Sequence, residues 1–358
     1  MKLYAKVIII SLCFLFALTG CSKEEDNNSK WQQMDEVENQ AGTKLEMNDL
    51  GKTVMQVEIN NRSLLWFAPI FDDGSILTQE LTDTETILYL FNVETKEELH
   101  LNTLTFDNRD AQRVYAYAYQ DDEIIVYYDY LLQDLGQTPN KYYLYHRNTM
   151  ETEVIDYQEK IEVSHTSYSN YEMSRIKQVL FFNVEEGESF RIYQYNIDTK
   201  EISFVTDGKQ PKQYQDELLY INQDNNLISL AGTILNNNVV NYAVYEDTMV
   251  IVKEDRDNYQ NYAVLLIENE VEIKLFTKSK KEMLSNITCN KEFVSWENLG
   301  NENYMYHISK LELLQIKSDK STSIQVVISD DYVYWADTIS NSKDKNGGTI
   351  ILNYFKLD

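Results

Sequence analysis

One pattern recurs along most of this 358-residue sequence: a tight acidic turn that leads into a short strand of aromatic and β-branched residues. The clearest copy is residues 329–337 (SDDYVYWAD). Aspartate and asparagine close tight turns, whereas tyrosine, valine and isoleucine favour pleated, half-buried strands. Weaker copies occupy residues 72–77, 121–126, 215–220, 246–251 and 290–295, and an irregular one begins at Val179. The pattern predicts an all-β, repetitive fold.

The repeat has the length of a four-stranded propeller blade. The first apolar residues of successive marker strands lie about 43 residues apart on average, and a propeller blade takes about 40–45 residues. In several repeats the marker strand is followed by a polar loop, a Tyr-x-Tyr strand and a fourth strand. The spacing therefore predicts a β-propeller over residues 44–358, with seven blades favoured. Six or eight blades stay open as alternatives, because the step from Leu218 to Met249 is short.

The marker strands also indicate how the blades pack. Residues 124–128 (IIVYY) and 179–182 (VLFF) are apolar on both faces, which is typical of a sheet that is covered on both sides. The last repeat offers three strands only, and residues 53–59 alternate without a partner of their own. Pairing residues 53–59 with the last strands would close the ring and remove an exposed edge. We predict this closure.

The net charge of −26 restricts the partners of the chain. Such a surface repels phosphate backbones, so we expect no nucleic acid as a partner. It also opposes adsorption to anionic lipid headgroups, so an attachment to the membrane must come from something other than a basic patch. Hydrophobic residues make up 43% of the chain, which is sufficient for a packed core.

The N-terminus has the features of an export signal. Lys2 and Lys6 precede an apolar run, residues 7–17, which is too short for a comfortable transmembrane span. Residues 18–21 (LTGC) resemble the lipobox of bacterial lipoproteins. The resemblance implies cleavage before Cys21 and a diacylglycerol on its thiol. Two or three acyl chains on this residue would anchor the protein durably in a membrane. An ordinary cleaved signal and a single-pass anchor are the alternatives.

These features predict three parts of the chain. They are a lipoprotein signal peptide (1–20), an acidic flexible tether (21–43) and the propeller domain (44–358). The expected location is the extracytoplasmic face of the cell membrane, to which the lipid on Cys21 would attach the protein.

Residues 332–337 (YVYWAD) resemble the YWTD repeat of propeller proteins, with Ala336 at the position where threonine is usual. Residues 293–297 (FVSWE) are a poorer match. Over most of residues 50–358 the chain resembles bacterial YWTD-like and TolB-like propeller lipoproteins, although the Ser-Pro-Asp-Gly turn of TolB does not occur in it. The resemblance implies a fold and not an activity.

No motif for catalysis or metal binding occurs in the sequence, and its four histidines do not form metal-ligand spacings. We expect no cofactor and no metal. In propellers, ligands usually contact the face that is built by the loops between second and third strands and by the linkers between blades. The candidate ligand-binding residues in such loops are Arg109, Tyr130, Asp134, Arg256, Asp257 and Tyr259.

Two functions fit these observations. The first is a membrane-anchored binding or scaffold module for a protein or glycan, which requires no catalytic residues. The alternative is a surface enzyme, a glycan hydrolase or lyase, whose acidic residues come from separate blades. Two carboxylates at catalytic separation near the axis, one with a raised pKa, would favour the enzyme. Dispersed tyrosines and amides would favour the binding module.

Overall fold

A computed structural model describes residues 45–46, 52–65, 67–107, 111–132, 141–155, 173–186, 189–268, 271–280, 285–297, 303–310, 312–316, 323–339 and 349–357. All of them belong to one compact unit, Ala41–Asp358, which is described here by itself. The regular elements among the described residues are 29 β-strands. Among these residues no helix has the length and apolar character needed to cross a membrane. The predicted signal peptide, tether and Cys21 lie outside the described residues.

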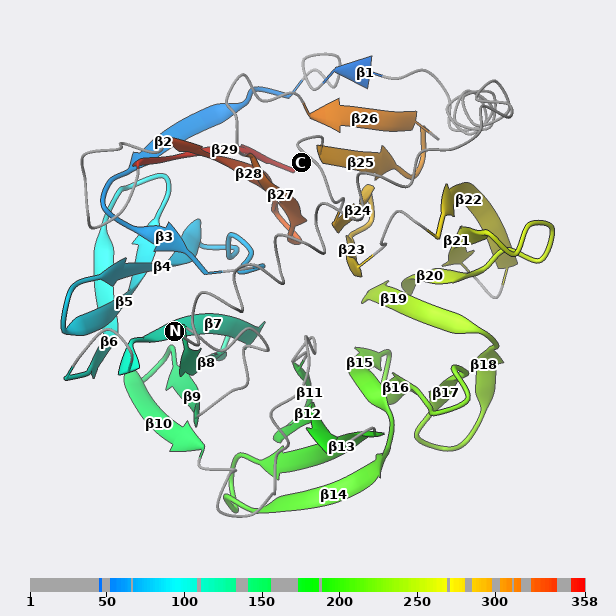
Figure 1. The fold of residues 1–358 in the computed structure, drawn as a ribbon, viewed down its shortest axis with the longest axis horizontal. Helices are drawn as coiled ribbons and strands as arrows, with labels where there is room; N and C mark the ends of the chain where they lie inside the picture. The colour runs from blue at the N-terminus through cyan, green and yellow to red at the C-terminus, as the bar shows by residue number, and fades with distance from the viewer. Residues whose placement is uncertain are drawn as a thin grey trace, which may run out of the picture. The chain divides into compact units, whose positions relative to one another are not determined.

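The strands form seven antiparallel blades around one axis, as predicted (Figure 1). Each blade starts with its innermost strand and proceeds outward. Blade 1 contains β3 (Ser63–Leu64), β4 (Ser75–Leu81), β5 (Glu85–Asn92) and β6 (Glu98–Thr105); blade 2 contains β7 (Arg113–Gln120), β8 (Ile124–Leu131), β9 (Lys141–His146) and β10 (Glu151–Ile155); blade 3 contains β11 (Met173–Ile176), β12 (Val179–Glu186), β13 (Ser189–Asn196) and β14 (Ile202–Asp207).

The remaining four blades follow the same order. Blade 4 contains β15 (Lys209–Tyr214), β16 (Glu217–Ile221), β17 (Leu227–Ser229) and β18 (Ile234–Asn236); blade 5 contains β19 (Val239–Tyr245), β20 (Thr248–Glu254), β21 (Asn261–Glu268) and β22 (Val271–Ser279); blade 6 contains β23 (Ser285–Cys289), β24 (Phe293–Glu297), β25 (Asn303–His307) and β26 (Glu312–Ile316); blade 7 contains β27 (Ser323–Ile328), β28 (Tyr332–Ile339), β29 (Thr349–Lys356) and β2 (Met55–Ile59).

The ring closes as predicted. Strand β2 pairs antiparallel with β29, with Met55 opposite Tyr354 and Ile59 opposite Ile350. Val57 and Ile59 are buried between blades 7 and 1, whereas the residues that alternate with them face outward. One strand was not predicted: β1 (Leu45–Glu46) pairs parallel with β26 as a fifth, outermost strand of blade 6.

Blades stack through strands that are apolar on both faces. In β8, Ile124 and Val126 pack into the cluster that joins blades 2 and 3, while Ile125 and Tyr127 pack into the cluster that joins blades 1 and 2. This confirms the interpretation of the two-sided marker strands. Blade 4 is complete although its outer strands β17 and β18 have three residues each, which explains the short step after Leu218.

Because the strands of a blade are antiparallel, its connections lie alternately on two faces of the ring. We call the face with the first–second and third–fourth turns the turn face. The opposite face, with the second–third loops and the linkers between blades, is the loop face. The repeated acidic turns of the sequence lie on the turn face. Of the predicted ligand-binding residues, Arg256, Asp257 and Tyr259 lie in a second–third loop, that of blade 5, and so belong to the loop face.

Candidate functional site

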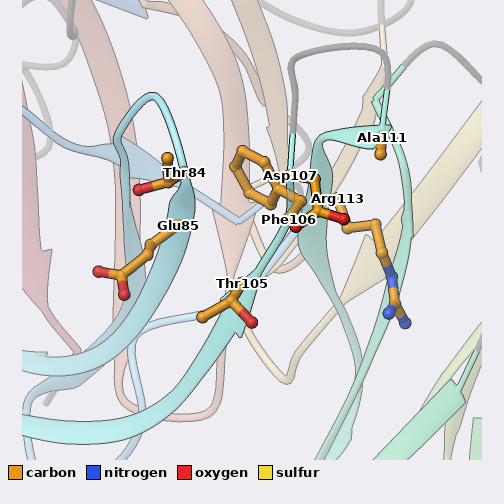
Figure 2. A pocket seen from close by; sticks show the side chains of 7 residues that line it. All are labelled: Thr84, Glu85, Thr105, Phe106, Asp107, Ala111 and Arg113. Carbon is orange, nitrogen blue, oxygen red and sulfur yellow. The ribbon is translucent and has the colours of Figure 1, made fainter.

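A cleft of about 380 Å³ opens on the loop face where blades 1 and 2 meet (Figure 2). One wall is the β4–β5 turn with Thr84 and Glu85, and the other is the linker between β6 and β7. Phe106 and Asp107 lie between Glu85 and Arg113 in the view of Figure 2. The lining residues are Thr84, Glu85, Thr105, Phe106, Asp107, Ala111 and Arg113. The volume falls near the lower end of the range for small-ligand sites, about 300–1,000 Å³.

Local hydrogen bonds shape the wall at the β4–β5 turn. The Thr82 hydroxyl accepts hydrogen bonds from the backbone N–H of Thr84 at 3.3 Å and of Glu85 at 2.9 Å. This is the usual way in which a threonine closes a turn without glycine. The Phe106 N–H donates to the Thr84 carbonyl at 2.9 Å, so the end of β6 is fixed to the same turn.

An ion pair lies at the Arg113 side of the cleft. The Asp129 side chain is fully buried, and the Nε and Nη2 atoms of Arg113 both contact its Oδ2 atom. The Tyr143 hydroxyl hydrogen-bonds the same carboxylate, and burial together with this carboxylate raises the Tyr143 pKa. A buried carboxylate is stable only with such partners. Among the described residues, no group pairs with Nη1 of Arg113, whose side chain is 26% exposed.

Buried hydrogen bonds between blades 1 and 2 fix the cleft. The Thr86 hydroxyl donates to the Arg113 carbonyl at 2.6 Å. Gln79 forms two bonds with Tyr115: its Oε1 accepts from the Tyr115 N–H at 2.9 Å, and its Nε2 donates to the Tyr115 carbonyl at 3.3 Å. Thr86 and Gln79 belong to blade 1, whereas Arg113 and Tyr115 belong to β7 of blade 2. The two walls are therefore connected below the surface.

The cleft presents polar groups that are available to a ligand. Glu85 is half-buried and Asp107 is exposed, and within the described part of the chain neither carboxylate has a hydrogen-bond or ion-pair partner. The Thr84 and Thr105 hydroxyls and the guanidinium of Arg113 complete the polar lining. In Figure 2 the Glu85 carboxylate and the Arg113 guanidinium extend to opposite sides of Phe106 and Asp107, so these two charged groups do not converge on one point.

A second polar feature surrounds the axis on the turn face. Some acids of the repeated turns join neighbouring blades: Arg147 pairs with Asp73 at 2.6 Å, and Arg175 pairs with Asp121 at 2.8 Å and with Glu123 at 2.5 Å. These pairs give part of the acidic repeat a structural role.

Other acids of the same turns form what we call the acidic ring: Asp72, Asp122, Glu246, Asp330 and Asp331, from blades 1, 2, 5 and 7. Partial burial raises the pKa of Asp330 to about 6, and repulsion from the other four carboxylates adds to the increase. Burial and the same kind of repulsion also raise the pKa of Asp72. The surrounding turns bury part of Asp330 while much of its surface stays exposed to solvent, and carboxylates of three other blades are near enough to affect its proton affinity.

The predicted ligand-binding residues lie on several blades. Tyr130 is in β8, next to Asp129, but its side chain packs toward blade 3, away from the cleft. Arg256, Asp257 and Tyr259 lie in the β20–β21 loop of blade 5, where Tyr259 is 73% exposed. The structure does not bring these residues to the cleft.

The other predicted site residues, Arg109, Asp134 and Cys21, lie outside the described residues. The sequence did not single out Glu85, Asp107 or Arg113. Two of them, Asp107 and Arg113, lie within four residues of Arg109, which the sequence indicated as a candidate ligand-binding residue. Glu85 had no such indication.

Cys289 is a buried free thiol in β23, and burial raises its pKa to about 12. Within the described residues, no group of three or more His, Cys, Asp or Glu side chains is arranged to bind a metal ion.

No protein-family model matches the sequence, and no curated protein matches it. The similarity to known proteins is in structure. The chain is similar to the crystal structure of an oligogalacturonate lyase from Vibrio parahaemolyticus, with a TM-score of 0.54 and 11% identity over 86% of this chain and 96% of that chain. It is also similar to an uncharacterised protein from Listeria monocytogenes, with a TM-score of 0.50 and 10% identity over 83% of this chain and 94% of that chain.

The structure of TolB from Acinetobacter baumannii matches with a TM-score of 0.41 and 14% identity over 79% of this chain and 65% of that chain. At these identities the comparisons with the oligogalacturonate lyase and the Listeria monocytogenes protein show the fold alone. The described chain is a seven-bladed β-propeller, and its function has to be inferred from its surfaces.

Proposed function

We propose that the protein is a lipid-anchored module on the extracytoplasmic face of a cell membrane, and that its propeller binds a protein or glycan through the loop face. The observation that carries the binding function is the cleft between blades 1 and 2. Within the described residues its carboxylates have no hydrogen-bond or ion-pair partner, its walls are connected by buried hydrogen bonds, and it lies on the face where propellers usually hold ligands. The sequence LTGC at residues 18–21 supports the lipid anchor at Cys21.

The cleft is better suited to a ligand that enters a concavity than to a flat protein surface. Rigid walls reduce the conformational entropy that is lost when a ligand binds, and polar groups inside a concavity select ligands with complementary hydrogen-bonding groups. The ligand contact is therefore expected to involve Asp107, which is exposed in the linker that forms one wall.

Capture of ligands by the full-length protein tests the binding function. Wild-type protein, the Glu85→Ala/Asp107→Ala variant and the control variant Asp224→Ala are incubated with cell-surface extracts and with glycan and peptide arrays. Asp224 is an exposed acid in the β16–β17 loop of blade 4, on the same face as the cleft. We expect wild type and the control to retain the same ligands and the cleft variant to lose them. Equal retention by all three proteins would refute the cleft as the binding site.

The lipid anchor is tested separately. Metabolic labelling with an acyl-chain analogue is expected to mark wild-type protein and not the Cys21→Ala variant. Equal labelling of both, or labelling of neither, would contradict the proposed anchor.

The acidic ring supports a second candidate function, a surface glycan hydrolase or lyase with acids from separate blades. A carboxyl group with a pKa of about 6 can act as an acid or a base near neutral pH, and Asp330 has this property beside carboxylates of three other blades. The test is hydrolysis or elimination of a polysaccharide panel by wild type and Asp330→Asn. An activity that depends on Asp330, with an apparent pKa near 6 in its pH profile, would favour the enzyme. Equal activity of the two proteins, or none, would exclude Asp330 as a catalytic residue.

A further inference from the structure

We propose that the outer edge of blade 4 binds a second copy of this chain, so that two propellers pair through their β18 strands about a twofold axis. Blade 4 takes no part in the cleft between blades 1 and 2, and the pairing does not depend on the proposed function. The composition of β18, the exposure of its apolar side chains and the charge of the rest of the chain all indicate this contact.

Strand β18 (Ile234–Asn236) is the outermost strand of blade 4 and contains no charged residue. Figure 1 shows it on the outer side of the ring. Sheet edges are normally protected by charged side chains, which oppose pairing with the edge of another molecule. Among the described strands, the outermost strand of each of the other blades contains an acidic residue: Glu46 in β1, Glu58 in β2, Glu98 in β6, Glu151 in β10, Asp207 in β14 and Glu272 in β22. The edge of blade 4 lacks this protection.

Exposed apolar side chains take the place of charges at this edge. Leu230, Ile234 and Leu235 are 47%, 57% and 41% exposed. Gly232 lies in the β17–β18 turn between Leu230 and Ile234, and a Cβ atom at this glycine would have no atom of the described chain within 4 Å. The turn is therefore open to its surroundings. Apolar side chains gathered at an unpaired sheet edge are typical of an interaction surface.

The charge distribution indicates which partner fits this edge. Residues 225–245 contain no charged residue, although 25% of the chain is charged and its net charge is −26. Glu272 of blade 5, which accepts a hydrogen bond from Asn236, is paired with Lys253 at 3.5 Å. A basic partner would be attracted to the acidic edges of the other blades, whereas a strongly acidic partner binds best where like charges do not meet. A second copy of this chain is such an acidic partner.

The backbone of β18 suits a symmetric pair. Two identical edge strands related by a twofold axis run antiparallel, and each offers the same hydrogen-bonding groups to the other. The chain itself shows that the outer edge of a blade accepts a further strand, because β1 pairs with β26 of blade 6. Strand β18 has three residues, so the interface is small, and small interfaces are typical of transient contacts. We therefore expect a weak dimer whose population rises with protein concentration.

Sedimentation velocity of the full-length protein in a nonionic detergent, from micromolar to millimolar concentration, tests the pairing. Wild type should change from one chain to two as its concentration rises. Leu235→Glu gives β18 the acidic residue that the other edges have and should weaken the association about tenfold or more. The control is Phe204→Glu in β14, the outermost strand of blade 3, where Phe204 is 52% exposed; it should associate as wild type does. Both substituted side chains are exposed, so both variants are expected to fold.

Two further measurements test the symmetry and the role of charge. Leu235→Lys alone should also be a single chain, whereas an equal mixture of Leu235→Glu and Leu235→Lys should associate again, because opposite charges then meet across the twofold axis. Raising the salt concentration from 0.1 M to 1 M shortens the screening length from about 10 Å to about 3 Å. The wild-type dimer should become stronger, because repulsion between two acidic chains is reduced.

Several results would overturn the pairing of two copies. Wild type that stays a single chain at the highest concentration would do so, and this is the result expected if the edge binds a different protein instead. Association of Leu235→Glu as strong as that of wild type would show that β18 is not the contact. A dimer that salt weakens would indicate ion pairs rather than an uncharged edge, and a mixture of the two variants that stays unassociated would contradict the twofold arrangement.

Discussion

The acidic ring makes a prediction about stability that has an unusual direction. An aspartate normally has a lower pKa in the folded than in the unfolded protein, so that folding is favoured as the pH rises. Asp330 has the opposite behaviour, because burial and four neighbouring carboxylates raise its pKa from 3.8 to about 6. The folded state therefore binds a proton more tightly than the unfolded state between these two pH values. The contribution of Asp330 to stability is complete below pH 3.8 and is lost as the pH rises through 6.

The magnitude follows from the same two values. A difference between 3.8 and about 6 corresponds to about 3 kcal/mol, at 1.36 kcal/mol for each pH unit. Asp330 is exposed, and solvent and salt screen the interactions of exposed charges, so the free-energy effect is expected to be about 1 kcal/mol. The Asp330→Asn variant, which is uncharged at every pH, should be more stable than wild type by this amount at pH 7.5 and low salt.

Urea unfolding, followed by circular dichroism at pH 4 and pH 7.5, measures the effect. The gain in the free energy of unfolding should nearly disappear at pH 4, where wild-type Asp330 is protonated in the folded state, and should shrink at high salt. Asp216→Asn, in the corresponding turn of blade 4, is the matched control. A variant that is no more stable than wild type at pH 7.5, or a gain that persists at pH 4, would refute the electrostatic explanation.

Three further substitutions test the packing, each by the change in the free energy of unfolding in urea. Ile59→Ala in the closing strand should cost about 2–5 kcal/mol, against less than about 0.5 kcal/mol for the outward-facing Glu58→Ala; equal effects would contradict the closure. Asp129→Ala should cost about 3 kcal/mol, because it leaves the partly buried guanidinium of Arg113 without its partner; a neutral result would mean that the ion pair adds nothing. Tyr334→Phe should cost about 1–3 kcal/mol, because the Tyr334 hydroxyl donates to the carbonyl of Ala68 in blade 1 at 2.5 Å, and an unchanged stability would argue against this bond.

Much of the fold could be predicted because it depends on local and periodic patterns. The acidic turns, the strands with two apolar faces and the average spacing between them predicted four-stranded blades and their number. The closing strand could be predicted because residues 53–59 alternate and the last repeat lacks a strand. The pairing of β1 with β26 could not be predicted, since a strand of two residues has no periodicity to recognise.

The candidate site could be predicted in outline only. The sequence indicated Arg109 as a candidate ligand-binding residue, close to Asp107 and Arg113, but the cleft is also lined by Thr84 and Glu85 of a different hairpin. Arg113 and Asp129 are 16 residues apart and meet because β7 and β8 are adjacent strands. The acidic turns were recognised as turns, yet their convergence around the axis is a property of the ring. No spacing along the chain encodes these contacts.

The pairing of β2 with β29 has a consequence for the order in which the domain folds. Met55 and Tyr354 lie at opposite ends of the propeller sequence, so bringing them together costs about 5 kcal/mol of chain entropy in an otherwise open chain. Contacts of such long range form late and slow the reaction. Blades 1 to 6 can form while the ribosome is still adding residues, but blade 7 stays incomplete until the last eight-residue strand has emerged. A nascent chain that lacks β29 is therefore an open arc, and it can become a ring only after this strand has been synthesised.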